Sequence, residues 1–283
     1  MDFMNMTRIP YAFTQTLFIA LGFLHAGGLD IKLLALGMLA LSPLMAYGGV
    51  YILNDLADRE HDRAHPKKRD RAIASGRIAK GKALVLALTL MLAGLALSLY
   101  LGFWFAVITA IVIANNLAYS FRPRFKDSLF LGLLSCSLNY PLRFLAGVSL
   151  AQTSVSGLLQ AALLFLIALH GFSAYRIYDI KSKSPGKTFR SECKLTAVIR
   201  ATALTAAGIT LAIHYAKMPA LALAMSAYML LFSEINLRIV KRGIDFFQLL
   251  RPWKAAREKN WFACFPFMVC ILAVIVFYAI VKS

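Results

Sequence analysis

The chain has 283 residues, of which 60% are hydrophobic, and it carries a formal net charge of +18. Soluble domains average about 45–50% apolar residues, so this composition excludes an ordinary soluble enzyme. The apolar residues fall in runs near the ~17–25 residues that a membrane-spanning helix needs, and the basic residues lie between those runs, which argues against nucleic acid as the partner.

The apolar runs predict an all-α, polytopic membrane protein, because backbone groups in hydrocarbon need hydrogen bonds within the segment. A β-barrel would need alternating strands of about 10 residues, and nothing alternates that way. We expect a single domain, residues 1–283, with nine transmembrane helices. In chain order they cover residues 11–28, 32–54, 82–100, 102–121, 128–150, 157–178, 195–216, 218–238 and 261–281.

Basic residues are concentrated in every second connection between these helices. The connections after the first, third, fifth and seventh spans carry almost none, only Lys32 and Lys217. Lys and Arg favour the cytoplasmic side of a membrane. The alternation therefore predicts a cytoplasmic N-terminus and an active-site cap at the cytoplasmic membrane. This cap consists of the four basic connections, 55–82, 121–128, 176–194 and 238–260.

The second span ends in three carboxylates, Asp55, Asp58 and Asp62, at spacing i, i+3, i+7. On a continuous helix this spacing puts all three on one face. Like charges so close together repel, and carboxylate oxygens suit Mg²⁺ or Mn²⁺ that shares its ligand shell with substrate phosphates. The alternative is a solvated helix end that happens to be acidic.

Basic side chains follow the carboxylates directly, and Lys and Arg pair with phosphate oxygens. Acids that hold a metal beside bases that hold phosphate predict a metal–diphosphate site. The phosphate-binding candidates here are Arg63, Lys67, Lys68, Arg69 and Arg71.

The pattern N-D-x-x-D-x-x-x-D at Asn54–Asp62, closing the second of nine helices, resembles the UbiA superfamily of intramembrane prenyltransferases. The resemblance implies a bundle around a central cavity, a diphosphate donor, a polyprenyl lipid substrate and Mg²⁺ held between the diphosphate and two aspartate motifs. It also implies that Asn54, Asp55, Asp58 and Asp62 are metal–diphosphate residues.

The second aspartate motif of that family departs from its pattern here. Its i, i+4, i+8 positions at the end of the sixth span are Tyr175, Asp179 and Lys183, so only Asp179 keeps the catalytic acid that the resemblance implies. The motif is about three charge units more positive than three aspartates. Lys183, Lys187 and Arg190 are therefore expected to bind phosphate in place of a second metal. A decayed motif in an inactive member is the alternative.

Two segments look like the branch of polyprenyl-phosphate phosphoribosyltransferases: Asp62–Arg77, with the pattern D-R-x-x-H-P-x-K-R-x-R-x-I-A-S-G, and Leu142–Gly147. The branch implies phosphoribosyl diphosphate as donor and a polyprenyl phosphate as acceptor, with the basic residues after Asp62 binding the 5-phosphate. Gly186-Lys187-Thr188 looks more like ordinary prenyltransferases, which leaves prenyl transfer to an aromatic or other acceptor as the second hypothesis. An anion or lipid transporter is the hypothesis from another class.

Polar side chains within the spans are candidates for lining the cavity. Arg143 is the clearest, because a charge inside the membrane is costly and usually functional. Snorkelling or a structural hydrogen bond is the alternative. The full set is Tyr51, Tyr119, Asn139, Arg143, Tyr175 and Tyr178. The acceptor, the lipid length and the oligomeric state stay open.

Overall fold

A computed structural model describes residues 6–7, 9–41, 45–64, 68–154, 157–183, 196, 198–208 and 210, and every regular element in these ranges is helical. The described chain divides into two compact units. The first contains the described residues up to 135 and residues 139–157. The second contains residues 136–138 and everything described from residue 158 onward. The all-α prediction is confirmed for these residues, and the single domain stays a prediction.

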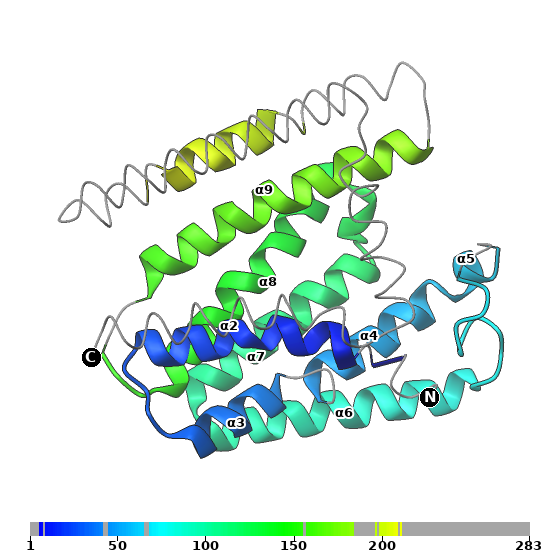
Figure 1. The fold of residues 1–283 in the computed structure, drawn as a ribbon. Helices are drawn as coiled ribbons and strands as arrows, with labels where there is room; N and C mark the ends of the chain where they lie inside the picture. Colours follow the sequence, from blue (N-terminus) through cyan, green and yellow to red (C-terminus); the bar gives the residue numbers. More distant parts are fainter. Residues whose placement is uncertain are drawn as a thin grey trace. The chain divides into compact units, whose positions relative to one another are not determined.

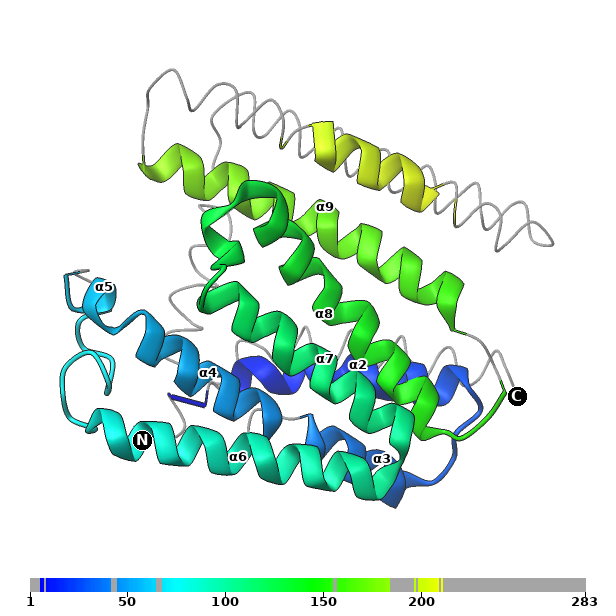
Figure 2. The same ribbon diagram turned by 180° about the vertical axis from the view of Figure 1, so that it is seen from behind.

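The first unit is a bundle of antiparallel helices, in which α6 packs against α3, α4 and α7 (Figure 1, Figure 2). Within the described residues, α6, α7 and α8 are long and apolar enough to cross a membrane. The elements in chain order are α2 (Ile9–His25), α3 (Ile31–Ala40), α4 (Ala46–Ala57), α5 (Arg59–Ala64), α6 (Lys80–Leu101), α7 (Phe103–Ser120), the 3-10 turn η1 (Phe125–Asp127) and α8 (Leu129–Leu150).

The second unit contains α9 (Leu158–Lys183) and the helical residues Val198–Gly208. A buried histidine joins the two segments, since His170 Nδ1 lies 3.4 Å from the carbonyl oxygen of Arg200. This contact gives His170 a structural role within the second unit.

The second predicted span, 32–54, is two helices rather than one. α3 ends at Ala40, and α4 begins at Ala46. Pro43 lies between them in the sequence, and proline has no N–H to donate and disfavours helical geometry in the residue before it. The predicted spans 218–238 and 261–281, part of 195–216 and the connection 238–260 lie outside the described residues, so the number nine stays a prediction.

Glycines let the helices of the first unit approach closely. A Cβ atom on Gly22 of α2 would overlap the carbonyl oxygen of Phe144 on α8, and one on Gly147 of α8 would overlap that of Ile19 on α2. Small residues at such crossings are typical of membrane helices, because lipid offers no hydrophobic driving force and close backbone packing replaces it.

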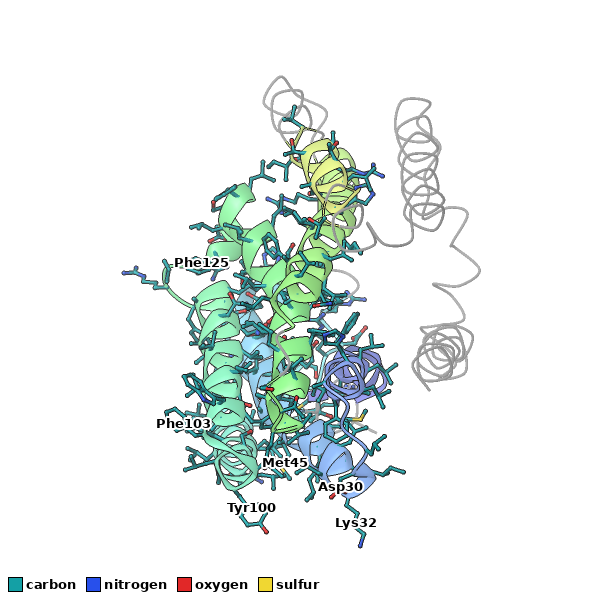
Figure 3. All side chains as sticks on the ribbon, turned by 90° about the vertical axis from the view of Figure 1, so that its left-hand side faces the viewer. Asp30, Lys32, Met45, Tyr100, Phe103 and Phe125 are labelled. Carbon is teal, nitrogen blue, oxygen red and sulfur yellow. The ribbon has the colours of Figure 1, made fainter. Side chains whose placement is uncertain are left out.

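The outer faces of α6 and α7 are apolar. Val85 and Leu92 are each 66% exposed, and Tyr100, Phe103 and Trp104 are exposed where α6 meets α7. Figure 3 shows Tyr100 and Lys32 at the lower edge of the unit in that view, and Phe103 below Phe125 of η1 along its left side. An apolar band that ends in aromatic side chains is typical of a lipid-facing surface.

Candidate active site

The helix that carries the first acidic motif breaks at its middle carboxylate. α4 ends at Ala57, Asp58 caps it, and α5 begins at Arg59. The backbone N–H of Asp58 donates to the carbonyl of Asn54 at 3.0 Å, and that of Asp62 donates to the carbonyl of Asp58 at 2.8 Å. The acidic motif therefore lies on two helices that meet at Asp58 rather than on one continuous helix, and the shared face of its three carboxylates stays a prediction.

Asp55 and Asp62 converge on one guanidinium nitrogen. Arg71 Nη1 donates to Asp55 Oδ1 at 3.1 Å and to Asp62 Oδ2 at 2.6 Å. Asp55 is 6% exposed and Asp62 is 1% exposed, whereas the Arg71 side chain is 33% exposed, so the carboxylates are the buried members of these ion pairs. Lys68 Nζ lies 3.7 Å from the other oxygen of Asp62. The two acids form a buried pair that holds one positive charge between them.

Asp58 faces the connection between α7 and α8. Its Oδ1 accepts a hydrogen bond from Lys126 Nζ and lies 3.9 Å from Arg124 Nη2. Neither cation was among the residues predicted for the site. The signal was present in the charge alternation, because connections 55–82 and 121–128 were both expected at the cytoplasmic mouth. The structure thus brings four cations, Arg71, Lys68, Lys126 and Arg124, to three carboxylates.

The acidic end of α4 fits a magnesium ion. Asn54 Oδ1 and Asp62 Oδ1 are buried and have no hydrogen-bond partner in the described chain. Oxygen atoms of this kind are the ligands that Mg²⁺ prefers, and Mg²⁺ commonly takes one or two carboxylates and completes its shell with water and phosphate. No group of three acidic, histidine or cysteine side chains within the described ranges is arranged to hold a metal alone. Asp55, Asp62 and Asn54 together with a phosphate ligand therefore suit the ion better than a protein-only cage.

Two arginine side chains hydrogen-bond to the backbone of the connection after α5. Arg59 Nε donates to the carbonyl of Ile73 at 3.2 Å, and Arg63 Nε donates to that of Ala74 at 2.8 Å. Ile73 is buried and packs in an apolar cluster with Ile52 and Leu53 of α4. These contacts fix the segment that presents Arg71, so Arg63, which was predicted to bind phosphate, supports the connection in this structure.

The structure describes only some of the other residues that were predicted to bind phosphate or to form the second motif. Lys68 faces Asp62, and Arg69 is exposed. Lys67, Lys187 and Arg190 lie outside the described residues. The backbone of α9 includes Tyr175, Tyr178, Asp179 and Lys183, but their side chains lie outside the described part. The role of the second motif therefore stays a prediction.

A polar cluster joins three helices of the first unit. Asn116 Nδ2 lies 2.8 Å from Asn139 Oδ1 of α8 and 3.1 Å from the hydroxyl of Tyr47 on α4. The Tyr47 ring contacts that of Tyr51 at 5.3 Å between centroids. The cluster includes the predicted cavity residues Asn139 and Tyr51.

Arg143 stacks on this cluster. Its guanidinium carbon lies 4.2 Å from the centroid of the Tyr47 ring, which is cation–π geometry. Its side chain is buried, so the alternative of snorkelling to the membrane surface is wrong. The central cavity that these residues were expected to line stays a prediction.

Comparison with known proteins gives several partial relatives. The chain is 37% identical over 112 residues to the decaprenyl-phosphate phosphoribosyltransferase of Mycolicibacterium smegmatis, covering 40% of this chain and 35% of the relative. It is 33% identical over 135 residues to the digeranylgeranylglyceryl phosphate synthase of Saccharolobus solfataricus, covering 47% and 46% of the two chains. The match thus spans less than half of either relative.

The fold matches solved structures over nearly the whole chain. A UbiA homologue from Archaeoglobus fulgidus bound to GPP and Mg²⁺ superposes with a TM-score of 0.74 at 17% identity, covering 99% of both chains. An apo UbiA homologue from Aeropyrum pernix gives a TM-score of 0.60 at 18% identity, covering 95% of this chain and 98% of the other. The family model of UbiA prenyltransferases matches residues 15–242. The chain therefore belongs to the UbiA prenyltransferase family.

Proposed function

We propose that this protein is a Mg²⁺-dependent membrane transferase that moves a 5-phosphoribosyl group from phosphoribosyl diphosphate to a polyprenyl phosphate. The bond between ribose C1 and the diphosphate oxygen breaks, and an oxygen of the lipid phosphate forms the new bond to C1. The convergence of Asp55 and Asp62 on Arg71, beside unbonded oxygens of Asn54 and Asp62, carries the proposal.

The residues divide into two roles around the leaving diphosphate. Asp55, Asp62 and Asn54 would hold Mg²⁺, which when bound supplies positive charge to the departing oxygen. Arg71, Lys68 and the two cations beside Asp58 are available to phosphate oxygens, and fixed cations stabilise the negative charge that develops there. The attacking lipid phosphate is already ionised, so no side chain is needed as a general base.

Charge and sequence favour the phosphoribosyl donor. Four cations meet three carboxylates at the described part of the site, and the second motif is more positive than three aspartates. Phosphoribosyl diphosphate carries one phosphate more than a prenyl diphosphate, and this additional negative charge matches the excess of positive charge at the site. The segment Asp62–Arg77 resembles the phosphoribosyltransferase branch, and a relative from Mycolicibacterium smegmatis carries that activity in its name.

Prenyl transfer is the second candidate, and one observation favours it. Tyr47 and Tyr51 form an aromatic pair on the helix that also carries Asp55. Aromatic faces stabilise a cation such as the one that develops on an allylic carbon. The Archaeoglobus fulgidus homologue of this fold was solved with GPP and with DMAPP. The family is one of integral membrane proteins, so both candidates place the chemistry in the membrane.

A paired incubation distinguishes the two donors. Purified protein in detergent receives radiolabelled phosphoribosyl diphosphate with a polyprenyl phosphate in one tube, and labelled prenyl diphosphate with 4-hydroxybenzoate in the other. We expect label in the lipid fraction of the first tube, and only when Mg²⁺ or Mn²⁺ is present. Transfer in the second tube alone would replace this proposal with the prenyl reaction.

A further inference from the structure

Arg143 is a buried cation without a hydrogen-bond acceptor. It is 1% exposed, and its Nε, Nη1 and Nη2 atoms bond to nothing in the described chain. A guanidinium carries five N–H donors in a rigid fork, and leaving such a charge buried and unpaired is costly. The Tyr47 ring lies 4.2 Å from the guanidinium carbon, and this contact supplies no hydrogen-bond acceptor to the N–H groups. An anionic ligand would satisfy them.

Hydrogen bonds within the bundle fix the ring on which Arg143 stacks. The Tyr47 hydroxyl accepts from Asn116, which also donates to Asn139 of the same helix as Arg143. All of these side chains are buried or partly buried. The stack is therefore preorganised, as a ligand-binding group needs to be.

The Arg143 stack and the acidic site share one face of α4. Tyr47, Tyr51 and Asp55 follow each other at intervals of four residues, which puts them on the same side of the helix. The contact between the two tyrosine rings agrees with that placement. At 1.5 Å of rise per residue, the eight residues from Tyr47 to Asp55 separate the two places by about 12 Å along the axis.

We infer that Arg143 binds the phosphate monoester of one of the two substrates of the reaction at Asp55 and Asp62; this rests on the proposed function. Two sources carry that group, the 5-phosphate of the donor and the phosphate of the polyprenyl acceptor. The guanidinium fork matches phosphate oxygens in pairs. A prenyl diphosphate would instead bring hydrocarbon beside the unpaired charge, so Arg143 selects against it.

Three variants test the inference. Arg143→Met removes the charge and keeps a long side chain, and Arg143→Lys keeps the charge but loses the planar fork. Thr109→Val is the matched control, because Thr109 is also buried and polar but accepts a hydrogen bond from Ser98 of α6 and donates one to the Phe105 carbonyl of its own helix, α7. The measurements are melting temperature in detergent and steady-state kinetics. The probes are Mg²⁺ with inorganic diphosphate, ribose 5-phosphate and a short polyprenyl phosphate.

We expect Arg143→Met to melt no lower than the wild type without ligand, since a buried unpaired charge has been removed. Stabilisation by Mg²⁺ and inorganic diphosphate should persist, because that probe binds at the acidic site. Stabilisation by one monoester probe should disappear, and which one identifies the source. The KM of the corresponding substrate should rise roughly 10- to 100-fold, the loss expected for charge-assisted hydrogen bonds. Arg143→Lys should fall between, and Thr109→Val should match the wild type in both KM values and in its stabilisation by each probe.

A lower melting temperature for Arg143→Met, with both monoester probes still stabilising it and both KM values unchanged, would overturn the inference and leave Arg143 as a packing residue. The proposed function would survive that result if phosphoribosyl transfer continued. Absence of phosphoribosyl transfer in the wild type would overturn the proposed function instead. In that case, loss of monoester binding in Arg143→Met would still support the binding site.

Discussion

Arg71 occupies the position between two buried carboxylates that a metal ion would compete for. Its Nη1 atom lies 2.6 Å from Asp62 and 3.1 Å from Asp55. Neutralising either acid leaves the guanidinium with one partner, and removing the guanidinium leaves two acids with buried negative charge. Substitutions in Asp55, Asp62 and Arg71 therefore test whether the two acids only pair with the guanidinium or also bind a metal ion.

Asp62→Asn should lower transferase activity at least ~100-fold, a loss comparable to that of a principal electrostatic group at an active site. The amide keeps the shape of the carboxylate but not its charge. Asp70→Asn is the control, because Asp70 lies in the same connection and is exposed. The measurement is the initial rate of each variant at saturating substrate and Mg²⁺. Equal rates for Asp62→Asn and Asp70→Asn would contradict a catalytic role of Asp62.

Arg71→Met should destabilise the metal-free protein by about 1–3 kcal/mol, the cost of leaving buried charged groups unpaired. Added Mg²⁺ should restore more stability to this variant than to the wild type, because the ion no longer competes with the guanidinium. Melting temperature against Mg²⁺ concentration measures both effects. An identical Mg²⁺ response in the two proteins would show that Arg71 and the metal use different places.

The break between α4 and α5 separates the motif residues onto two helices, and the close crossing of α2 and α8 positions the part of α8 that carries Arg143. Asp58 caps α4, which turns its carboxylate toward Lys126 while Asp55 and Asp62 meet Arg71. Gly22 of α2 and Gly147 of α8 allow the backbones of these two helices to touch, and Gly147 lies four residues after Arg143 in the chain. The crossing depends on glycine at both positions.

Gly147→Ala should lower the melting temperature although alanine is the better helix former, because its methyl group would overlap the Ile19 carbonyl. Gly81→Ala is the control: a Cβ atom at Gly81 of α6 meets nothing within 4 Å. That change should be neutral or stabilise by up to about 1 kcal/mol, the difference in helix propensity. Equal effects of the two substitutions would mean that the crossing is looser than described.

The sequence alone predicted the helical fold and the acidic motif, because apolar run length and carboxylate spacing are local properties. It missed the break in the second span and the cap at Asp58, although Pro43 was visible. It placed Arg71 among the phosphate-binding residues, which stays a prediction. It could not show that Arg71 also bridges Asp55 and Asp62, because spacing does not reveal which side chains meet. Lys126 was missed for the same reason: its partner is 68 residues away.

At the scale of the whole molecule, the basic connections and the aromatic residues at the α6–α7 junction imply opposite membrane faces for the two ends of the first unit. Tyr100 and Trp104 are exposed at one end, and the cations beside Asp58 lie in a connection from the opposite ends of α7 and α8. The orientation follows from the positive-inside rule and stays a prediction.

Cysteine labelling tests that orientation. In a variant whose four native cysteines are replaced by serine, Leu29→Cys should react with a membrane-impermeant maleimide in intact cells, since Leu29 is 87% exposed. Asp70→Cys, in the basic connection, should react only after permeabilisation. The reverse pattern would invert the topology and put the acidic site outside the cytoplasm.

The central claim is that Asp55 and Asp62 hold a divalent ion together with a diphosphate. Its most direct test is Mn²⁺ binding followed by electron paramagnetic resonance, with and without inorganic diphosphate, in the wild type, Asp55→Asn, Asp62→Asn and Asp70→Asn. We expect diphosphate-dependent Mn²⁺ binding in the wild type and in Asp70→Asn, and we expect this binding to be lost in Asp55→Asn and Asp62→Asn. Undiminished binding in Asp55→Asn and Asp62→Asn would contradict it.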